Sequence, residues 1–329
     1  MAETAPVIII GSGPIGLAAG IELKKRAIPF LIIEKGCLAN SIFHYPTNMT
    51  FFSTSDRLEI GGVPFISHGD KPTRREALEY YKRVATSFEL PAKLYESVQS
   101  ITGDDGNFTV TTDKDTYEAS KVVIATGFYN QPKLMNVPGE DLPKVKHYYD
   151  EPHLYALQRV LVVGAANSAV DAALETFRSG AEVSMVIRDH KIDDRVKYWK
   201  KPDIENRIKE ESITAYFNSK VSAIRSDEVD IKTPDGNVTI ENDFVLAMTG
   251  YKPNFQLFEE LGIELTDDSS QMPVYDEQTQ ETSRKGVYVA GVICGGLDTN
   301  RWFIENARDH AYKLAEDIEK QLASKTVEA

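Results

Sequence analysis

Cysteine is almost absent from this sequence of 329 residues, which contains only Cys37 and Cys294. The two cysteines are far apart and form no C-x-x-C pair, so a redox dithiol of that type is excluded. Zinc-ligand spacing is also missing, and we expect no metal site. A structural disulfide is not expected either, because the reducing interior of a cell disfavours one.

Long apolar runs and an excess of positive charge are missing as well. No stretch reaches the roughly 20 apolar residues that a membrane span needs. The apolar segment 6–19 is interrupted by glycine and proline and has no basic leader, which argues against a signal peptide. We therefore expect a cytoplasmic protein with no membrane partner. The net charge of -13 argues against nucleic-acid binding, which requires a basic surface.

A βαβ pattern is present, and it occurs twice. The apolar runs 7–10 and 30–33 predict buried parallel strands on either side of a helix at 17–25. The runs 160–163 and 182–187, with a helix at 170–179 between them, repeat this pattern. The length suits two domains. We therefore predict an α/β protein with two Rossmann-like dinucleotide-binding domains.

The first βαβ unit carries the fingerprint Gly11-x-Gly13-x-x-Gly16 between its strand and its helix. Gly11 permits the tight turn, Gly13 lets a diphosphate approach the backbone, and Gly16 lets the helix pack closely. The helix N-terminus offers free N–H groups to the phosphates. Glu34 ends the next strand, where a carboxylate can accept hydrogen bonds from both ribose hydroxyls. This context predicts a dinucleotide site.

The second unit has a weaker version of the motif, Gly164-x-Ala166-x-x-Ala169. Asn167 and Ser168 supply donors at the start of its helix. The following strand ends in Arg188 instead of an acid, which favours the 2′-phosphate of NADP over NAD. Lys191 and Arg195 add positive charge, whereas Asp189 weakens the argument, and Arg188 as a solvated strand-end residue remains the alternative. Two dinucleotide sites in one chain indicate electron transfer from a nicotinamide to a flavin.

Over nearly its whole length, the chain resembles flavoproteins of the thioredoxin reductase type. Several segments narrow this resemblance to the bacillithiol-disulfide reductase family, which lacks the C-x-x-C: 40–55, 59–65, 71–74, Asn167-Ser168-Ala169-Val170 and Ala290-Gly291-Val292-Ile293. The resemblance implies FAD, NADPH and a small disulfide as acceptor. It also implies a discontinuous FAD domain, 1–134 and 252–329, around an NADPH domain, 135–251. We expect a homo-oligomer.

The resemblance and the motifs together define the cofactor-binding residues that we predict. Those for FAD are Gly11, Gly13, Pro14, Ile15, Gly16, Glu34, Lys35, Asn40, Ser41, Thr126, Gly127, Gly291 and Val292. Those for NADPH are Gly164, Asn167, Ser168, Ala169 and Arg188. No catalytic residue is assigned, because hydride transfer from nicotinamide to flavin needs stacking more than it needs a general acid.

Ile15 departs from the resembled family, whose members commonly have cysteine at this position. A thiolate at a helix N-terminus could attack a disulfide, and isoleucine cannot. Cys294 is then the better redox candidate, and Cys37 is expected near the adenosine end. A ferredoxin- or flavodoxin-NADP reductase, which would use a redox protein as acceptor, fits Ile15 better. A nucleotide-sensing flavoprotein with slow turnover is a further alternative. A flavoprotein monooxygenase is disfavoured because the linking histidine motif is not apparent.

Overall fold

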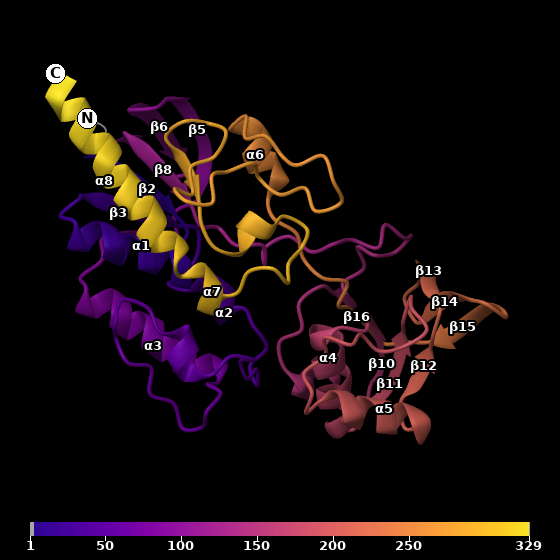
Figure 1. The fold of residues 1–329 in the computed structure, drawn as a ribbon. Helices are drawn as coiled ribbons and strands as arrows, with labels where there is room; N and C mark the ends of the chain where they lie inside the picture. The colour runs from indigo at the N-terminus through magenta and orange to yellow at the C-terminus, as the bar shows by residue number, and fades with distance from the viewer. Residues whose placement is uncertain (1–2, 329) are drawn as a thin grey trace. The chain divides into compact units, whose positions relative to one another are not determined.

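The computed structural model describes residues 3–328 and contains two compact units (Figure 1). Unit 1 comprises Met1–Phe43, Met49–Gln131 and Tyr251–Ala329, and unit 2 comprises His44–Asn48 and Pro132–Gly250. The segment His44–Asn48 groups with unit 2, to which the Thr47 N–H donates a hydrogen bond at the Asp150 carbonyl (2.8 Å). The sequence does not indicate that this short segment belongs to unit 2.

Unit 1 is built on a five-stranded parallel sheet in the order β17-β8-β2-β3-β4. Its strands are Val287–Val289 (β17), Lys121–Ile124 (β8), Val7–Ile10 (β2), Phe30–Glu34 (β3) and Ala92–Leu94 (β4). The strands β2, β3, β8 and β17 are buried along their whole length. This burial on both faces explains their continuous apolar sequences.

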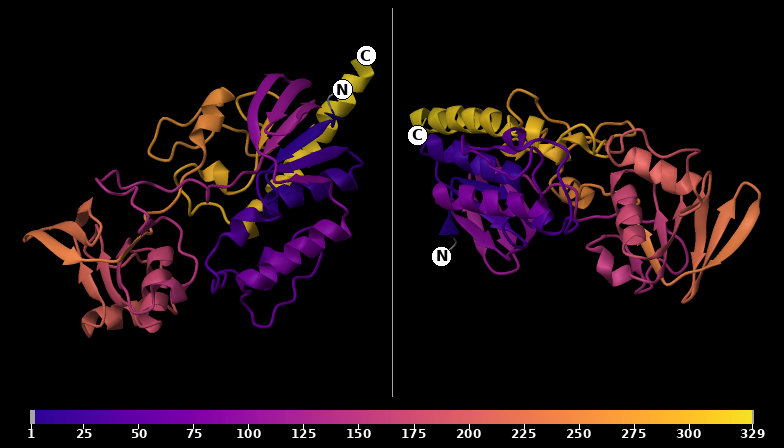
Figure 2. Two further views of the ribbon diagram at one scale, coloured as in Figure 1. Left: turned by 180° about the vertical axis from the view of Figure 1, so that it is seen from behind. Right: turned by 90° about the horizontal axis from the view of Figure 1, so that it is seen from below.

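Alternate residues of β2 and β3 point to opposite faces of this sheet. Ile8, Ile10, Leu31 and Ile33 belong to one core cluster with Phe108 and Tyr117 of a second sheet. That sheet has the order β1-β7-β6-β5, with strands Glu3–Thr4 (β1), Thr116–Ala119 (β7), Asn107–Thr112 (β6) and Val98–Asp104 (β5). Helices α1 (Pro14–Lys25) and α8 (His310–Glu328) lie side by side in unit 1 (Figures 1 and 2).

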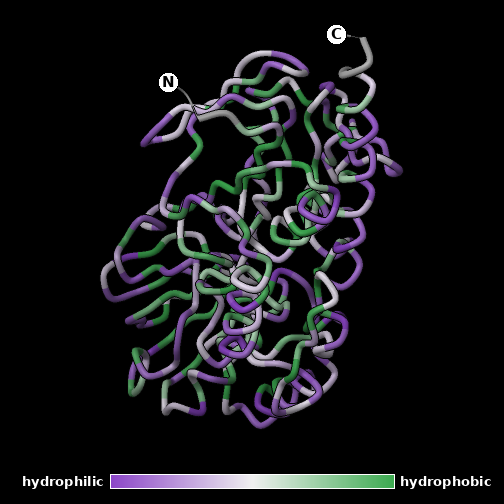
Figure 3. The backbone as a smooth tube through the Cα atoms, turned by 90° about the vertical axis from the view of Figure 1, so that its left-hand side faces the viewer, coloured by the Kyte–Doolittle hydropathy of each residue, from purple (hydrophilic) through white to green (hydrophobic). Residues whose placement is uncertain are grey.

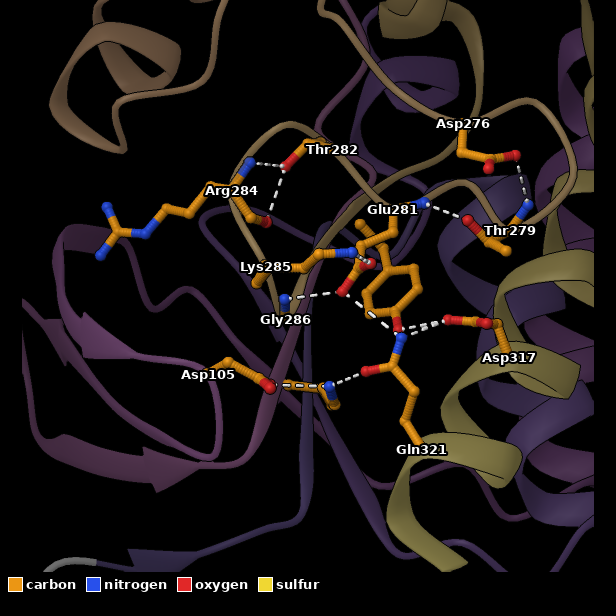
Figure 4. Close-up of polar contacts among 12 residues, drawn as sticks. Asp105, Asp276, Thr279, Glu281, Thr282, Arg284, Lys285, Gly286, Asp317 and Gln321 are labelled. Carbon is orange, nitrogen blue, oxygen red and sulfur yellow. Dashed lines mark hydrogen bonds and ion pairs between the residues drawn. The ribbon is translucent and has the colours of Figure 1, made fainter. Parts of the chain in front are cut away.

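Helix α8 attaches to unit 1 through both apolar and polar contacts. Hydrophobic and hydrophilic residues alternate along it towards the C-terminus in Figure 3, as an amphipathic helix requires. Lys121 of β8 is 0% exposed. Its Nζ donates to Asp105 (2.7 Å) and to Gln321 of α8 (Figure 4). Tyr288 of β17 donates to Asp317 of α8 (2.7 Å), so two strands hold the helix by partly buried hydrogen bonds.

The other helical segments of unit 1 are short, except for α3 (Arg74–Ser87). A capping box begins α3: Thr73 accepts from the Glu76 N–H, and Glu76 accepts from the Thr73 N–H. The short segments are α2 (Asn40–Phe43), α6 (Phe255–Glu260), α7 (Ile304–Ala307) and the 3-10 turns Ser55–Leu58 (η1) and Val292–Gly295 (η3). The sequence predicts one helix over 300–321. The chain instead turns at 298–303, where the Asn300 N–H donates to Asp298.

Unit 2 repeats the same architecture with a parallel sheet in the order β12-β11-β10-β16-β9. Its strands are Thr214–Tyr216 (β12), Glu182–Val186 (β11), Arg159–Val163 (β10), Phe244–Ala247 (β16) and Val145–Lys146 (β9). Helix α4 (Asn167–Arg178) packs on one face, with α5 (Lys201–Lys209) beside it. A hairpin sheet of Lys220–Ile224 (β13), Glu228–Thr233 (β14) and Gly236–Glu241 (β15) covers the other face, and Pro152–Tyr155 is a 3-10 turn (η2).

Candidate dinucleotide-binding sites

The turn after β2 has the geometry of a phosphate-binding loop. Gly11 has φ +108°, and a Cβ there would lie 2.6 Å from the Ala125 carbonyl oxygen. A Cβ on Gly16 would lie 2.0 Å from the Gly11 oxygen, so neither position admits a side chain. Apart from Gly13 itself and its two chain neighbours, no described atom lies within 4 Å of the Cβ position of Gly13. Gly11 and Gly16 therefore close the turn, while Gly13 leaves its outer side open.

Helix α1 begins at this turn without a side-chain cap. Gly13 is its N-cap, and Pro14 follows without an N–H to satisfy. The Leu17 N–H donates to the Gly13 carbonyl (2.9 Å) and closes the first turn of the helix. An uncapped N-terminus presents backbone N–H groups and a partial positive charge, which suit an anionic group.

Glu34 connects the turns after β2 and β3. Its Oε2 accepts from the backbone N–H (2.9 Å) and the hydroxyl (3.2 Å) of Ser12, and its Oε1 accepts from the Gly36 N–H (3.0 Å). A carboxylate has about four lone-pair sites, so one remains for a ribose hydroxyl. Asn40 is buried against Gly36, whereas Lys35 is exposed.

Three segments far apart in the sequence meet beside this turn. The Cβ position of Gly291 lies 3.3 Å from Ile15 Cγ1, and that of Gly127 lies 3.9 Å from Val292 Cγ2 and 4.0 Å from Ser41 Oγ. The Thr126 Cα lies 3.3 Å from the Cβ position of Gly11. The fold of unit 1 thus brings together several of the residues predicted for FAD from distant segments of the chain.

Ile15 fills the position where the resembled family commonly has a cysteine. Its side chain is 7% exposed and packs against Gly291. The first turn of α1 therefore carries no thiol of its own. The substitution replaces a reactive group with an apolar contact between the fingerprint and the segment that follows β17.

Neither cysteine has the environment of a reactive thiolate. Cys294 is fully buried in η3, and burial raises the pKa of its thiol well above the usual range. Its Sγ lies 3.7 Å from Nδ1 of His310, and burial lowers the pKa of that imidazole to about 4. Both groups are therefore neutral near pH 7, not a thiolate–imidazolium pair. Burial, followed by the charge of Glu34, also raises the pKa of Cys37.

His310 is a site residue that the sequence analysis misses. A histidine on the predicted last helix is more often an exposed or capping residue than an acid–base group, yet His310 is 2% exposed. Its Nδ1 accepts from the Gly291 N–H (3.2 Å), and the Trp302 ring packs edge-on against it at 4.5 Å. The sequence pattern that could have indicated this burial is the spacing of four residues from His310 to Leu314 and from Leu314 to Ile318, which places all three on the buried face of α8.

The turn after β10 in unit 2 is closed in the same way. Gly164 has φ +133°, and a Cβ there would lie 2.6 Å from the Met248 carbonyl oxygen and 3.2 Å from Ala169 Cβ. Helix α4 starts here without a side-chain cap, and Ser168 is exposed in its first turn. Asn167 is engaged elsewhere: it donates to the Arg195 carbonyl (3.2 Å) and accepts from the Lys197 N–H (2.9 Å). Its amide therefore fastens the loop that follows β11.

The positive charge near the end of β11 is smaller than the sequence suggests. Arg195 is paired with Asp193 (2.6 Å), and Lys191 is paired with Asp194. Arg188 is exposed, and no carboxylate within residues 3–328 forms an ion pair with it. Of the three predicted cations, Arg188 is the one whose charge remains available to an anion.

Two further kinds of site are not found in the described part of the chain. No helix there combines the length and the apolar character that crossing a bilayer requires. No group of three or more histidine, cysteine or acidic side chains in residues 3–328 could hold a metal ion.

Comparison with known proteins agrees with this geometry. The family described as "Pyridine nucleotide-disulphide oxidoreductase" matches residues 8–291. Bacilliredoxin reductase Bdr of Bacillus subtilis is 44% identical over 95% of this chain and 97% of its own. The structure of bacillithiol disulfide reductase Bdr from Staphylococcus aureus matches with a TM-score of 0.94 and 41% identity, over 97% of this chain and 99% of its own. Thioredoxin reductase of T. acidophilum, at 21% identity over 98% of this chain and 99% of its own, shares the fold with a TM-score of 0.77. The predicted fold class is confirmed.

Proposed function

We propose that this chain, which belongs to the pyridine nucleotide-disulphide oxidoreductase family, transfers hydride from NADPH through FAD to a small disulfide. The chain is an NAD(P)H-dependent flavin oxidoreductase whose cofactors are FAD and NADPH. The resemblance to bacillithiol-disulfide reductases is confirmed. The division of labour between the two units and the acceptor are the parts proposed.

The observation that supports this division is the pair of uncapped phosphate-binding turns, one in each unit. Unit 1 would hold FAD, because the buried Glu34 can accept from a ribose hydroxyl beside the open face of Gly13. Unit 2 would hold NADPH, because Arg188 follows the second strand, β11, by two residues, at the place where an acid would select NAD. Unit 1 comprises both ends of the chain and unit 2 its middle.

Bound FAD supplies a two-electron carrier between nicotinamide and acceptor. The protein itself binds the cofactor and shields it from side reactions. Gly13 admits the diphosphate, Ile15 covers Gly291 with an apolar side chain, and Gly127 and Val292 pack beside it. His310, neutral because its pKa is lowered to about 4, holds the Gly291 N–H and so fixes the turn after β17.

The proposed acceptor is bacillithiol disulfide, the compound after which the similar reductases from Staphylococcus aureus and Bacillus cereus are named. Ile15 and the two neutral cysteines favour a second candidate, a ferredoxin or flavodoxin. A one-electron protein acceptor needs no protein thiol, whereas attack on a disulfide by the protein requires a thiolate. We further propose that the protein is cytoplasmic and forms a homo-oligomer. Light scattering on the purified protein would test its oligomeric state.

Steady-state oxidation of NADPH with a panel of acceptors tests the proposal. The panel is bacillithiol disulfide, other small disulfides, ferredoxin, flavodoxin and oxygen, each assayed with the FAD-loaded protein. We expect turnover with bacillithiol disulfide to exceed turnover with oxygen by at least about tenfold. Turnover with ferredoxin or flavodoxin, and none with a disulfide, would show that the acceptor is a redox protein and not a small disulfide. Slow flavin reduction by NADPH in stopped flow would instead identify a nucleotide sensor.

A further inference from the structure

Lys133 lies at the carboxyl end of the parallel sheet of unit 2, although it precedes that sheet in the sequence. Its backbone N–H donates to the Gly250 carbonyl (2.9 Å), and its carbonyl accepts from the Thr249 hydroxyl (2.5 Å). The Cβ position of Gly250 is 3.9 Å from Lys133 Cδ. These contacts hold the lysine side chain beside the residues that follow β16.

Arg188 lies at the same edge of the sheet, on the other side of the Gly164 turn. Val163, the last residue of β10, pairs with Val186 of β11 on one side and with Ala247 of β16 on the other. Neighbouring strands lie about 4.8 Å apart, so the ends of β11 and β16 are about 10 Å apart. The phosphate-binding turn of unit 2 is therefore flanked by two long cationic side chains.

These two cations, Lys133 and Arg188, repel each other, and neither has an acidic partner within the described residues. Burial, followed by the positive charge of Arg188, lowers the pKa of Lys133. No described carboxylate forms an ion pair with either side chain. Neighbouring Lys191, Arg195 and Lys197 are each paired with an aspartate. Lys133 is partly buried and Arg188 is exposed. In a chain with a net charge of -13, two neighbouring cations without an ion-pair partner indicate an anionic ligand.

We propose that Lys133 binds the diphosphate of NADPH, while Arg188 binds its 2′-phosphate. This inference rests on the proposed NADPH site of unit 2 and adds a residue from outside the βαβ motif. Arg188 follows the second strand of that motif, where the 2′-phosphate is recognised. Lys133 lies beside Gly250, on the opposite side of the Gly164 turn. That turn leads into the N-terminus of α4, where a diphosphate is bound. The two cations thus have different effects on cofactor choice.

Binding of NADP+ and NAD+ to the oxidised, FAD-loaded protein separates the two roles without turnover. We expect Lys133→Met to raise the dissociation constants of NADP+ and NAD+ by the same factor, about ten or more, because both nucleotides carry the diphosphate. Arg188→Ala should weaken NADP+ alone. Lys133→Arg should restore binding of both nucleotides to within a few-fold. Lys191→Met, which removes a nearby cation already paired with Asp194, is the matched control and should leave both affinities unchanged.

Each other outcome has a definite meaning. If Lys133→Met weakens only NADP+, the lysine reads the 2′-phosphate and this inference is wrong. If it weakens neither nucleotide while Arg188→Ala acts as expected, the NADPH site stands and the lysine has no part in it. If Arg188→Ala leaves NADP+ binding unchanged, the assignment of the NADPH site itself fails. Unchanged flavin absorbance in every variant excludes misfolding as the cause.

Discussion

Replacing His310 with glutamine should make the folded protein less sensitive to acid. In the native state His310 is buried, its Nδ1 accepts from the Gly291 N–H, and its pKa is lowered from 6.5 to about 4. Burial is the main cause, followed by the charge of Lys313. Protonation would remove the acceptor and place a charge in an apolar environment. Glutamine can still accept the same hydrogen bond but cannot be protonated in this range.

The size of the effect follows from linkage between proton binding and folding. The unfolded chain binds the proton near pH 6.5 and the folded chain only near pH 4. The contribution of His310 to stability is therefore fully present above pH 6.5 and is lost as the pH falls towards 4. The full difference corresponds to about 3 kcal/mol, and about 2 kcal/mol is already lost at pH 5.

Urea unfolding at pH 7.5 and pH 5 measures this loss. Other carboxylates and histidines contribute to acid unfolding in both proteins, so the informative quantity is the difference between the two pH slopes. We expect the free energy of unfolding of His310→Gln to fall by about 2 kcal/mol less than that of the unsubstituted protein. His190→Gln, which removes an exposed histidine, controls for the loss of a histidine as such. Equal slopes for His310→Gln and the unsubstituted protein would refute the buried neutral imidazole.

Four further outcomes follow from the same structure. Arg188→Ala should weaken NADPH binding by about 1.5–3 kcal/mol and leave NADH unaffected in titrations; an equal loss for both would contradict its role. In the double variant Cys37→Ser, Cys294→Ser, the rate of flavin reduction by NADPH in stopped flow should stay within about tenfold of that of the unsubstituted protein, since both thiols are neutral. Gly16→Ala should abolish bound-flavin absorbance, because its Cβ would meet the Gly11 oxygen at 2.0 Å. Lys121→Met should lower the urea-derived stability by about 2 kcal/mol, because it removes the fully buried cation that donates to Asp105 and Gln321.

Local features allowed the fold class, the cofactors and the family to be predicted from the sequence. Each depends on residues close together in the chain: an apolar run, a glycine-rich turn and the residue that ends the next strand. Gly11 and Gly16 illustrate this, because their neighbours in the structure leave no room for a Cβ. A steric requirement within one turn restricts the residue type at that position, so it can be recognised from the sequence.

Features that depend on long-range packing were not predicted. Cys294 and His310 look like candidates for redox or exposed roles, and only their burial against each other and Trp302 shows that both are neutral. Lys191 and Arg195 look like phosphate ligands until the folded loop pairs them with aspartates.

The sequence by itself determined that this protein has two dinucleotide-binding turns and no dithiol, because those properties lie in short contiguous motifs. Only the tertiary structure decided which charges are available. It brings Lys133 to the same sheet edge as Arg188 through hydrogen bonds with Thr249 and Gly250. Whether a cation is paired or free, and whether a thiol or an imidazole is charged, depends on burial and on neighbours distant in the chain.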